Sequence, residues 1–104
     1  MTATATLYIV VYGNEWEDIM YFSDFQKAKR KLLIQTHAYD KDERDKFYPC
    51  LYELKEDNGV YKRTKNCYIV DAVQFNSAFK DKPIECIRDI QPDIIDRLVI
   101  NALV

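Results

Sequence analysis

The stretch IMYFSDFQKAKRKLLI, Ile19–Ile34, decides how the rest of the chain is interpreted, because a strand-like segment runs directly into a helix-like one. Ile19–Phe22 is apolar and aromatic, which is typical of a strand. From Phe25 onward, apolar residues recur at helical spacing. Ser23, with Gln26 three residues later, has the form of a capping box. The stretch therefore predicts a strand followed by a helix that is capped at Ser23.

The predicted helix has one apolar face and one basic face. Phe25, Ala28 and Leu32 fall on a single stripe, so we expect them to pack on a sheet. Three basic side chains fall on the opposite side, which we expect to point outward: Lys27, Arg30 and Lys31. Such a face is commonly just solvated, but it also suits a phosphate backbone or an acidic protein. The sequence leaves both interpretations open.

Strands are predicted on both sides of this stretch. Leu7–Tyr12, LYIVVY, is an unbroken apolar run, which predicts a central strand covered on both faces. We expect it to pair with Ile19–Phe22 as a hairpin. Further along, Phe47–Glu56 and Val60–Lys65 flank Asn58-Gly59, which predicts a second hairpin with a two-residue type I′ turn.

The last part of the chain predicts added helices. Pro92 opens a helix at a favourable first-turn position. An apolar stripe follows it: Ile94, Ile95, Leu98, Val99, Ala102 and Leu103. The stripe either covers the second face of the sheet or packs on a neighbouring molecule. We therefore expect residues 1–104 to form a single α+β domain, with an antiparallel sheet of about four strands in ββαββ order, one helix packed on it, and C-terminal helices added.

Composition and charge narrow the class of partner. The chain of 104 residues is long enough for one hydrophobic core, and its net charge of −2 lacks the basic excess of most nucleic-acid-binding proteins. Its early apolar run has no basic segment before it and is much shorter than a membrane span. We expect an intracellular, cytoplasmic protein with no membrane partner, for which nucleic acid ranks behind protein as a partner.

The sequence contains no motif for catalysis or for cofactor binding. A nucleophile with its base, a phosphate-binding glycine loop and a metal constellation are all missing from it. His37 is the one histidine, and the three cysteines form no CxxC pair. We expect no enzymatic activity, no cofactor, no metal and no small-molecule substrate.

Two of the cysteines fall in the second predicted hairpin. Counting outward from the Asn58-Gly59 turn places Cys50 opposite Cys67, in a pair whose side chains approach closely. The pair predicts either two small buried free thiols or a cross-strand disulfide. A bulge around residues 63–66, where the pattern turns polar, would break this count.

Candidate protein-binding residues lie at two places in the chain. Trp16, between Glu15 and Glu17, either folds back over the edge of the core or is an exposed anchor for a partner. Together with the terminal stripe it gives a predicted partner-binding set: Trp16, Ile94, Ile95, Leu98, Val99 and Leu103.

A second set of residues carries the nucleic-acid alternative. The second hairpin mixes basic side chains with Tyr61 and Tyr68, a combination that can stack on bases and neutralise phosphates. Acidic residues across the hairpin offset much of that charge. The full set joins the helix face to the hairpin: Lys27, Arg30, Lys31, Lys62, Arg63 and Lys65.

Four features follow one another in the chain: a strand, the pattern Phe22-Ser23-x-Phe25-x-x-Ala28-Lys29, a helix, and a tyrosine-rich hairpin that includes Tyr48–Leu54. Together they resemble small accessory or minor structural proteins of large DNA viruses. The resemblance covers about half the chain. It implies a location in the virion and no catalytic residue. Its leading implication is a non-enzymatic structural or interaction module whose partners are protein subunits of a larger assembly, or further copies of itself. The alternative is a nucleic-acid-associated regulatory protein.

Overall fold

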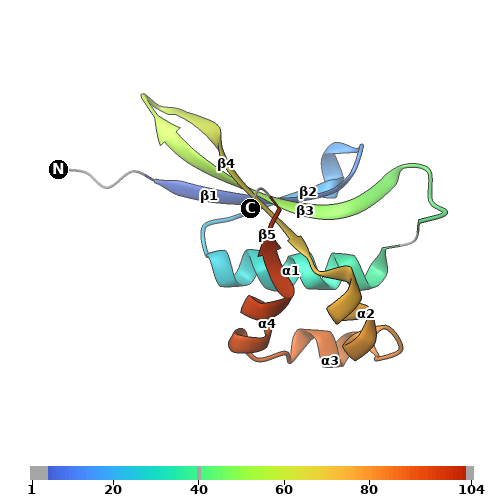
Figure 1. Ribbon diagram of the computed structural model, residues 1–104. Helices are drawn as coiled ribbons and strands as arrows, with labels where there is room; N and C mark the ends of the chain where they lie inside the picture. Colours follow the sequence, from blue (N-terminus) through green and yellow to red (C-terminus); the bar gives the residue numbers. More distant parts are fainter. Residues whose placement is uncertain (1–4, 40, 103–104) are drawn as a thin grey trace.

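The computed structural model describes residues 5–39 and 41–102, which form one antiparallel sheet with helices on one side of it (Figure 1). The elements in chain order are β1 (Thr6–Gly13), η1 (Trp16–Asp18), β2 (Ile19–Phe22), α1 (Phe25–Ala38), β3 (Lys46–Asp57), β4 (Val60–Val70), α2 (Ala72–Phe79), α3 (Ile84–Arg88), α4 (Pro92–Leu98) and β5 (Val99–Asn101). The strand order in the sheet is β2-β1-β3-β4-β5. The predicted α+β class and the initial ββαββ order are confirmed, but the sheet has a fifth strand.

That fifth strand replaces the end of the predicted last helix. Helix α4 ends at Leu98, and Val99 then pairs with Val70 of β4. Val99 and Ile100 are β-branched and favour a strand, and the edge of β4 offers unpaired backbone groups. The prediction of a continuous helix from Pro92 to the end of the stripe is therefore wrong for Val99–Ala102, and Leu103 lies outside the described residues.

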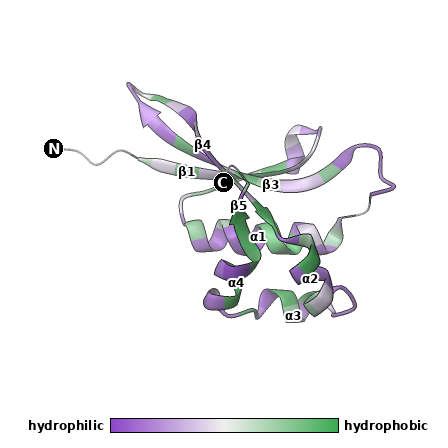
Figure 2. Ribbon diagram, in the orientation of Figure 1, coloured by the Kyte–Doolittle hydropathy of each residue, from purple (hydrophilic) through white to green (hydrophobic). Residues whose placement is uncertain are grey.

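The core lies between the sheet and the helices. Val10 and Leu51 from the sheet are fully buried against Ala28, Leu32 and Leu33 from α1. Figure 2 shows strongly hydrophobic segments in β5 and in the part of β4 that leads into α2. The predicted apolar stripe of α1 is confirmed as core.

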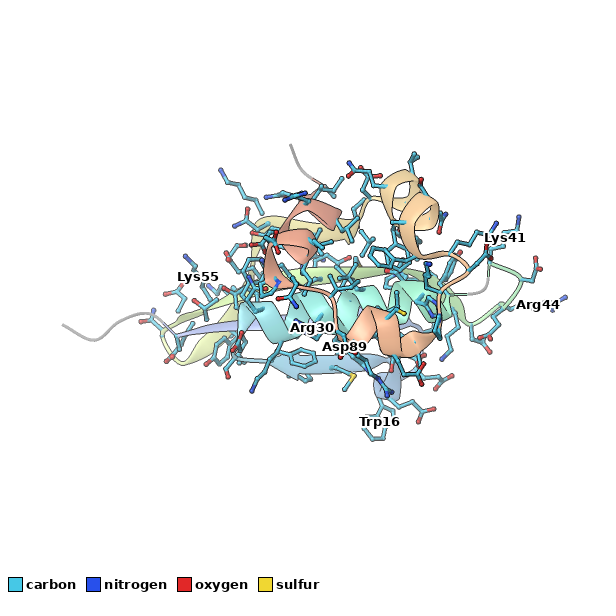
Figure 3. All side chains as sticks on the ribbon, turned by 90° about the horizontal axis from the view of Figure 1, so that it is seen from below. Trp16, Arg30, Lys41, Arg44, Lys55 and Asp89 are labelled. Atoms are coloured by element: carbon cyan, nitrogen blue, oxygen red, sulfur yellow. The ribbon has the colours of Figure 1, made fainter. Side chains whose placement is uncertain are left out.

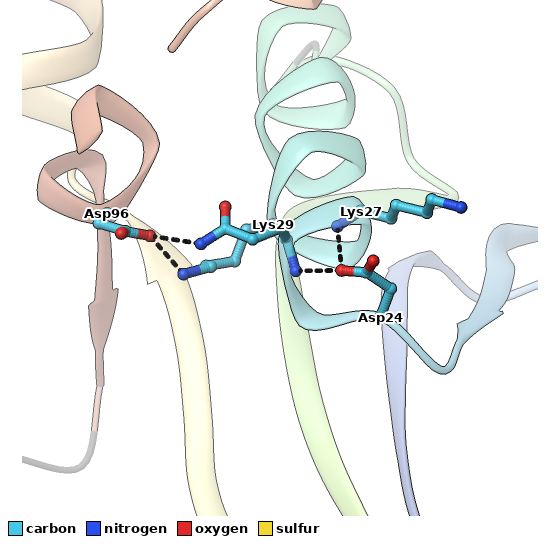
Figure 4. Close-up of polar contacts among 5 residues, drawn as sticks. Asp24, Lys27, Lys29 and Asp96 are labelled. Atoms are coloured by element: carbon cyan, nitrogen blue, oxygen red, sulfur yellow. Dashed lines mark hydrogen bonds and ion pairs between the residues drawn. The ribbon is translucent and has the colours of Figure 1, made fainter. Parts of the chain in front are cut away.

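Helix α1 begins one residue later than its predicted cap implies. Asp24, in extended conformation, accepts hydrogen bonds from the backbone N–H groups of Gln26 at 2.8 Å and Lys27 at 3.2 Å (Figure 4). Ser23 is therefore not the cap. A carboxylate caps as well as a hydroxyl does, and its charge suits the positive end of the helix.

Side chains of α1 also hold the C-terminal helices in a third layer. Lys29, which is buried, forms an ion pair with Asp96 of α4, and Gln26 Nε2 donates to the same carboxylate at 3.1 Å (Figure 4). The hydrogen bond from Lys29 lowers the pKa of Asp96 below its usual value. The helix is thus covered on two sides, by the sheet and by the segment after α2.

Arg30 contributes a second link between these layers. Its Nη1 atom donates to the carbonyl oxygen of Arg88, the last residue of α3, at 2.5 Å, and to that of Ile90, two residues later, at 2.8 Å. These carbonyls end a short helix and would otherwise lack partners. The prediction that Arg30 belongs to an outward basic face is wrong, because its guanidinium binds the chain itself.

The β3–β4 hairpin has the predicted turn but not the predicted register. Asn58 and Gly59 have φ of 54° and 81°, as the two-residue turn requires. A bulge past Leu54 then shifts the pairing, so that Cys67 faces Tyr52. Cys50 does not face Cys67, which corrects the prediction, and both cysteines are free.

A buried ionic corner joins β1, η1 and β3. Asp18, 3% exposed, accepts hydrogen bonds from Lys46 Nζ at 2.6 Å and from the Glu15 backbone N–H at 3.2 Å. The hydrogen bond from Lys46 lowers the pKa of Asp18. Gly13 lies against this carboxylate so closely that a Cβ atom there would be 2.1 Å from Asp18 Oδ2. The corner fixes the loop that carries Trp16.

A candidate protein-binding face

Successive side chains of a strand point to opposite faces of the sheet, and here the two faces differ in what covers them. Val10, Leu51 and Val70 point toward the helices and are buried. The residues between them point the other way. We call this second set the open face: Leu7, Ile9 and Val11 of β1, Ile19 and Tyr21 of β2, Cys50, Tyr52 and Leu54 of β3, Arg63, Cys67 and Ile69 of β4, and Ile100 of β5.

In the part of the chain that the structure describes, α1 to α4 all lie on the other side of the sheet (Figure 1). Tyr21 is 66% exposed and Ile100 is 40% exposed, while the remaining members are partly buried by one another. The prediction that Leu7–Tyr12 is covered on both faces is therefore wrong. Its apolar residues point both ways, but within residues 5–39 and 41–102 helices cover the face toward α1 alone.

At the centre of the open face, a phenol and a thiol are held in their neutral forms. A hydrogen bond with Cys50 raises the pKa of Tyr52 to about 12, so the phenol stays protonated. Burial raises the pKa of Cys67, which keeps this thiol in its less nucleophilic form. The Arg63 guanidinium lies 3.8 Å from the centre of the Tyr52 ring. These groups suit binding better than acid–base or nucleophilic chemistry.

Trp16 stands at the edge of this face. The Trp16 side chain is 82% exposed. The prediction that it folds over the edge of the core is therefore wrong, and the alternative prediction of an exposed aromatic side chain agrees with the structure. Figure 1 places η1 beside β2 on the side away from the helices, and Figure 3 shows Trp16 projecting beyond the rest of the molecule. The ionic corner at Asp18 holds this loop in place.

The other members of the predicted partner-binding set are not at a surface. Ile95, Leu98 and Val99 are buried in the core of the chain itself, and Ile94 packs against that core. Ile94, Ile95 and Leu98 are in α4 on the helix side of the sheet, and Val99 is in β5 beside Val70, so these residues neither cover the second face of the sheet nor form an exposed stripe. Leu103 lies outside the described residues.

The six predicted nucleic-acid-binding residues fall into two separate groups. Lys27, Arg30 and Lys31 are on α1, below the sheet, whereas Lys62, Arg63 and Lys65 are on the hairpin that extends beyond it (Figure 1). Arg30 binds backbone carbonyls, Lys62 pairs with Asp57 at 3.2 Å, and Arg63 stacks on Tyr52. The structure therefore does not gather them into one basic patch.

Two surface hollows lie at the C-terminal end of α1. The larger, with a volume of about 450 Å³, is lined by His37, Tyr39, Lys41, Tyr48 and Lys80, among others. The Nε2 atom of His37 lies 2.7 Å from the carbonyl oxygen of Lys82, so this nitrogen is already hydrogen-bonded to the backbone. Among the described residues, no group of three or more His, Cys, Asp or Glu side chains is placed to hold a metal ion.

Comparisons with known proteins identified no relative of this chain. No family model, no curated protein and no solved structure matches this chain. Of the helices within residues 5–39 and 41–102, none is long and apolar enough to cross a membrane. The candidate site therefore rests on the geometry of the open face.

Proposed function

We propose that this chain is a non-enzymatic protein–protein interaction module that binds its partner through the open face. The supporting observation is that Arg63 alone is charged among the twelve members of the open face, whereas charged residues make up 31% of the chain. Contiguous exposed apolar surface of this kind marks interaction sites. Tyr21 and Trp16 add large, stiff aromatic side chains, which are common at binding hot spots.

The narrower form of the proposal is a minor structural or assembly protein of a large DNA virus. It is supported by the resemblance carried by Phe22, Ser23, Phe25, Ala28 and Lys29, together with the tyrosine-rich hairpin. In such a particle the chain would bridge larger subunits, and it would be found in the virion.

Nucleic acid remains the competing proposal, with one feature in its favour. The Arg63–Tyr52 stack could extend to a base, as in single-strand-binding proteins. Such proteins also follow the phosphate backbone with a line of free cations. On the hairpin, Lys62 already pairs with Asp57, so we rank protein first.

A photo-crosslinking amino acid at Tyr21 tests the proposed function. Tyr21 is 66% exposed on the open face, and Val73, 80% exposed on α2, is the matched control on the helix side. In the native cell or particle, we expect the Tyr21 variant to give a discrete protein adduct that the Val73 variant lacks.

Three results of this experiment would contradict the proposal. Equal adducts from both positions, or none from Tyr21, would remove the open face as a binding surface. An adduct to nucleic acid at Tyr21 would support the competing proposal, in which the open face binds nucleic acid.

A further inference from the structure

We propose that the smaller hollow at the C-terminal end of α1 binds an alkylammonium group, the kind of cation found at the end of a lysine side chain. The hollow is separate from the open face, because α1 forms one of its walls. The inference therefore goes beyond the proposed function and does not rest on it. It adds a second site and the charge of the group that this site recognises.

Three aromatic side chains and one exposed carboxylate line the hollow. Tyr12 is near the end of β1, Tyr39 follows α1, and Phe47 is near the start of β3. Glu43 joins them from the loop before β3. The volume of the hollow is about 190 Å³, below the roughly 300–1,000 Å³ of sites for drug-sized ligands. Its size therefore suits a single side chain or a small organic ion.

The aromatic rings favour a cation that has apolar carbon around its charge. The face of an aromatic ring attracts a cation that lies within about 6 Å of the ring centre. The Lys46 ammonium, at the wall of the hollow, already lies 5.6 Å from the centre of the Tyr12 ring. The carbons of an alkylammonium group also pack on the rings, a contact that an inorganic cation does not make.

The charges that line the hollow add to this preference. Lys46 would repel a second cation, but its Nζ atom is paired with the buried Asp18 carboxylate at 2.6 Å. Glu43 forms no ion pair within residues 5–39 and 41–102. The pKa of Lys46 is raised, mainly by its hydrogen bond to Asp18 and further by the charge of Glu43. Because Asp18 balances Lys46, the Glu43 charge is left to attract the ligand.

The larger hollow has the opposite balance of charge. Two lysines, Lys41 and Lys80, line it together with a single carboxylate, that of Asp42. Its positive charge should exclude the cation that the smaller hollow attracts. We therefore expect an alkylammonium ligand at the hollow that contains Glu43 and not at its neighbour.

A proton NMR titration of the full chain with tetramethylammonium chloride tests the inference, with sodium chloride as the reference for ionic strength. We expect a millimolar dissociation constant, an upfield shift of the ligand methyl protons over the rings, and shifts in the Phe47 ring protons. Glu43→Gln should weaken binding by about fivefold. Glu85→Gln, which removes the same charge at an exposed position of α3, should leave the affinity unchanged.

Three further ligands identify the source of the cation: choline, a peptide with one trimethyl-lysine, and the same peptide with unmodified lysine. Binding of either peptide that is tighter than that of choline assigns the hollow to a protein side chain. Tighter binding of choline assigns it to a free small cation.

The inference is overturned if neither the methyl protons nor the Phe47 ring protons shift at concentrations well above the millimolar range. It is also overturned if Glu43→Gln and Glu85→Gln weaken binding equally, or if sodium acetate produces the same ring shifts. None of these results bears on the crosslink at Tyr21, which tests the open face.

Discussion

Gly13→Ala is expected to destabilise the fold by about 3 kcal/mol, because there is no room for a methyl group at this position. A Cβ atom would lie 2.1 Å from Asp18 Oδ2 and 2.9 Å from the backbone oxygen of Asp45. Asp18 cannot move away without leaving Lys46, and Asp45 O is held by the Asn14 backbone N–H at 3.1 Å. Urea unfolding of the purified chain measures the loss.

The neighbouring residue provides the control for this substitution. Asn14 is exposed, and its interaction in the corner is made by its backbone N–H, so Asn14→Ala should change the free energy of unfolding by less than about 0.5 kcal/mol. If Gly13→Ala and Asn14→Ala have the same unfolding midpoint, the buried corner does not have the proposed tight packing.

Leu51→Ala is expected to cost about 3 kcal/mol, whereas Leu54→Ala should cost about 1 kcal/mol or less. Both leucines are on β3, but Leu51 is fully buried toward α1 and Leu54 is partly exposed on the open face. The first substitution leaves a cavity, whereas the second removes a side chain that water already reaches. Urea unfolding at concentrations where the chain is monomeric gives both values.

The comparison of the two leucines also tests whether the sheet really has one covered face. Equal losses of stability would mean that the open face is packed like a core within a single chain. The proposed function would then lose its binding surface.

Local signals in the sequence were sufficient to predict several of the helices, strands and turns. The change of period after Phe22 located α1, and Asn58-Gly59 located the second hairpin with its positive φ angles. These predictions succeed because capping, helical spacing and turn chemistry involve residues close in sequence. The observed N-cap is Asp24 and not the predicted Ser23. Adjacent residues of similar capping strength cannot be ranked from the sequence.

The register of the hairpin depended on contacts between strands. Glu53 accepts side-chain hydrogen bonds from Thr64 at 3.0 Å and Asn66 at 3.1 Å, at the place where the pairing shifts. The polar run in β4 was a visible signal for a bulge, but its acceptor is on the opposite strand. The diagonal placement of Cys50 and Cys67 follows from that shift.

The open face could not be predicted because it depends on where the terminal helices pack. An apolar run such as Leu7–Tyr12 shows that both faces suit burial, but not what covers them. The decisive contacts are between distant segments, such as Arg30 with the carbonyl at the end of α3 and Lys29 with Asp96. They draw the terminal helices to the far side of α1, so no helix of the described residues covers the second face of the sheet.

Thiol alkylation of the unmodified chain tests the central claim, that the open face binds protein, most directly. Cys67 lies on the open face, and Cys86 is exposed on α3 on the helix side, so the molecule contains its own control. Rates are compared between dilute chain, chain about a hundredfold more concentrated, and chain in its native assembly. We predict that Cys67 reacts more slowly in at least one associated state while Cys86 keeps its rate. A Cys67 rate that is the same in all three would contradict the claim.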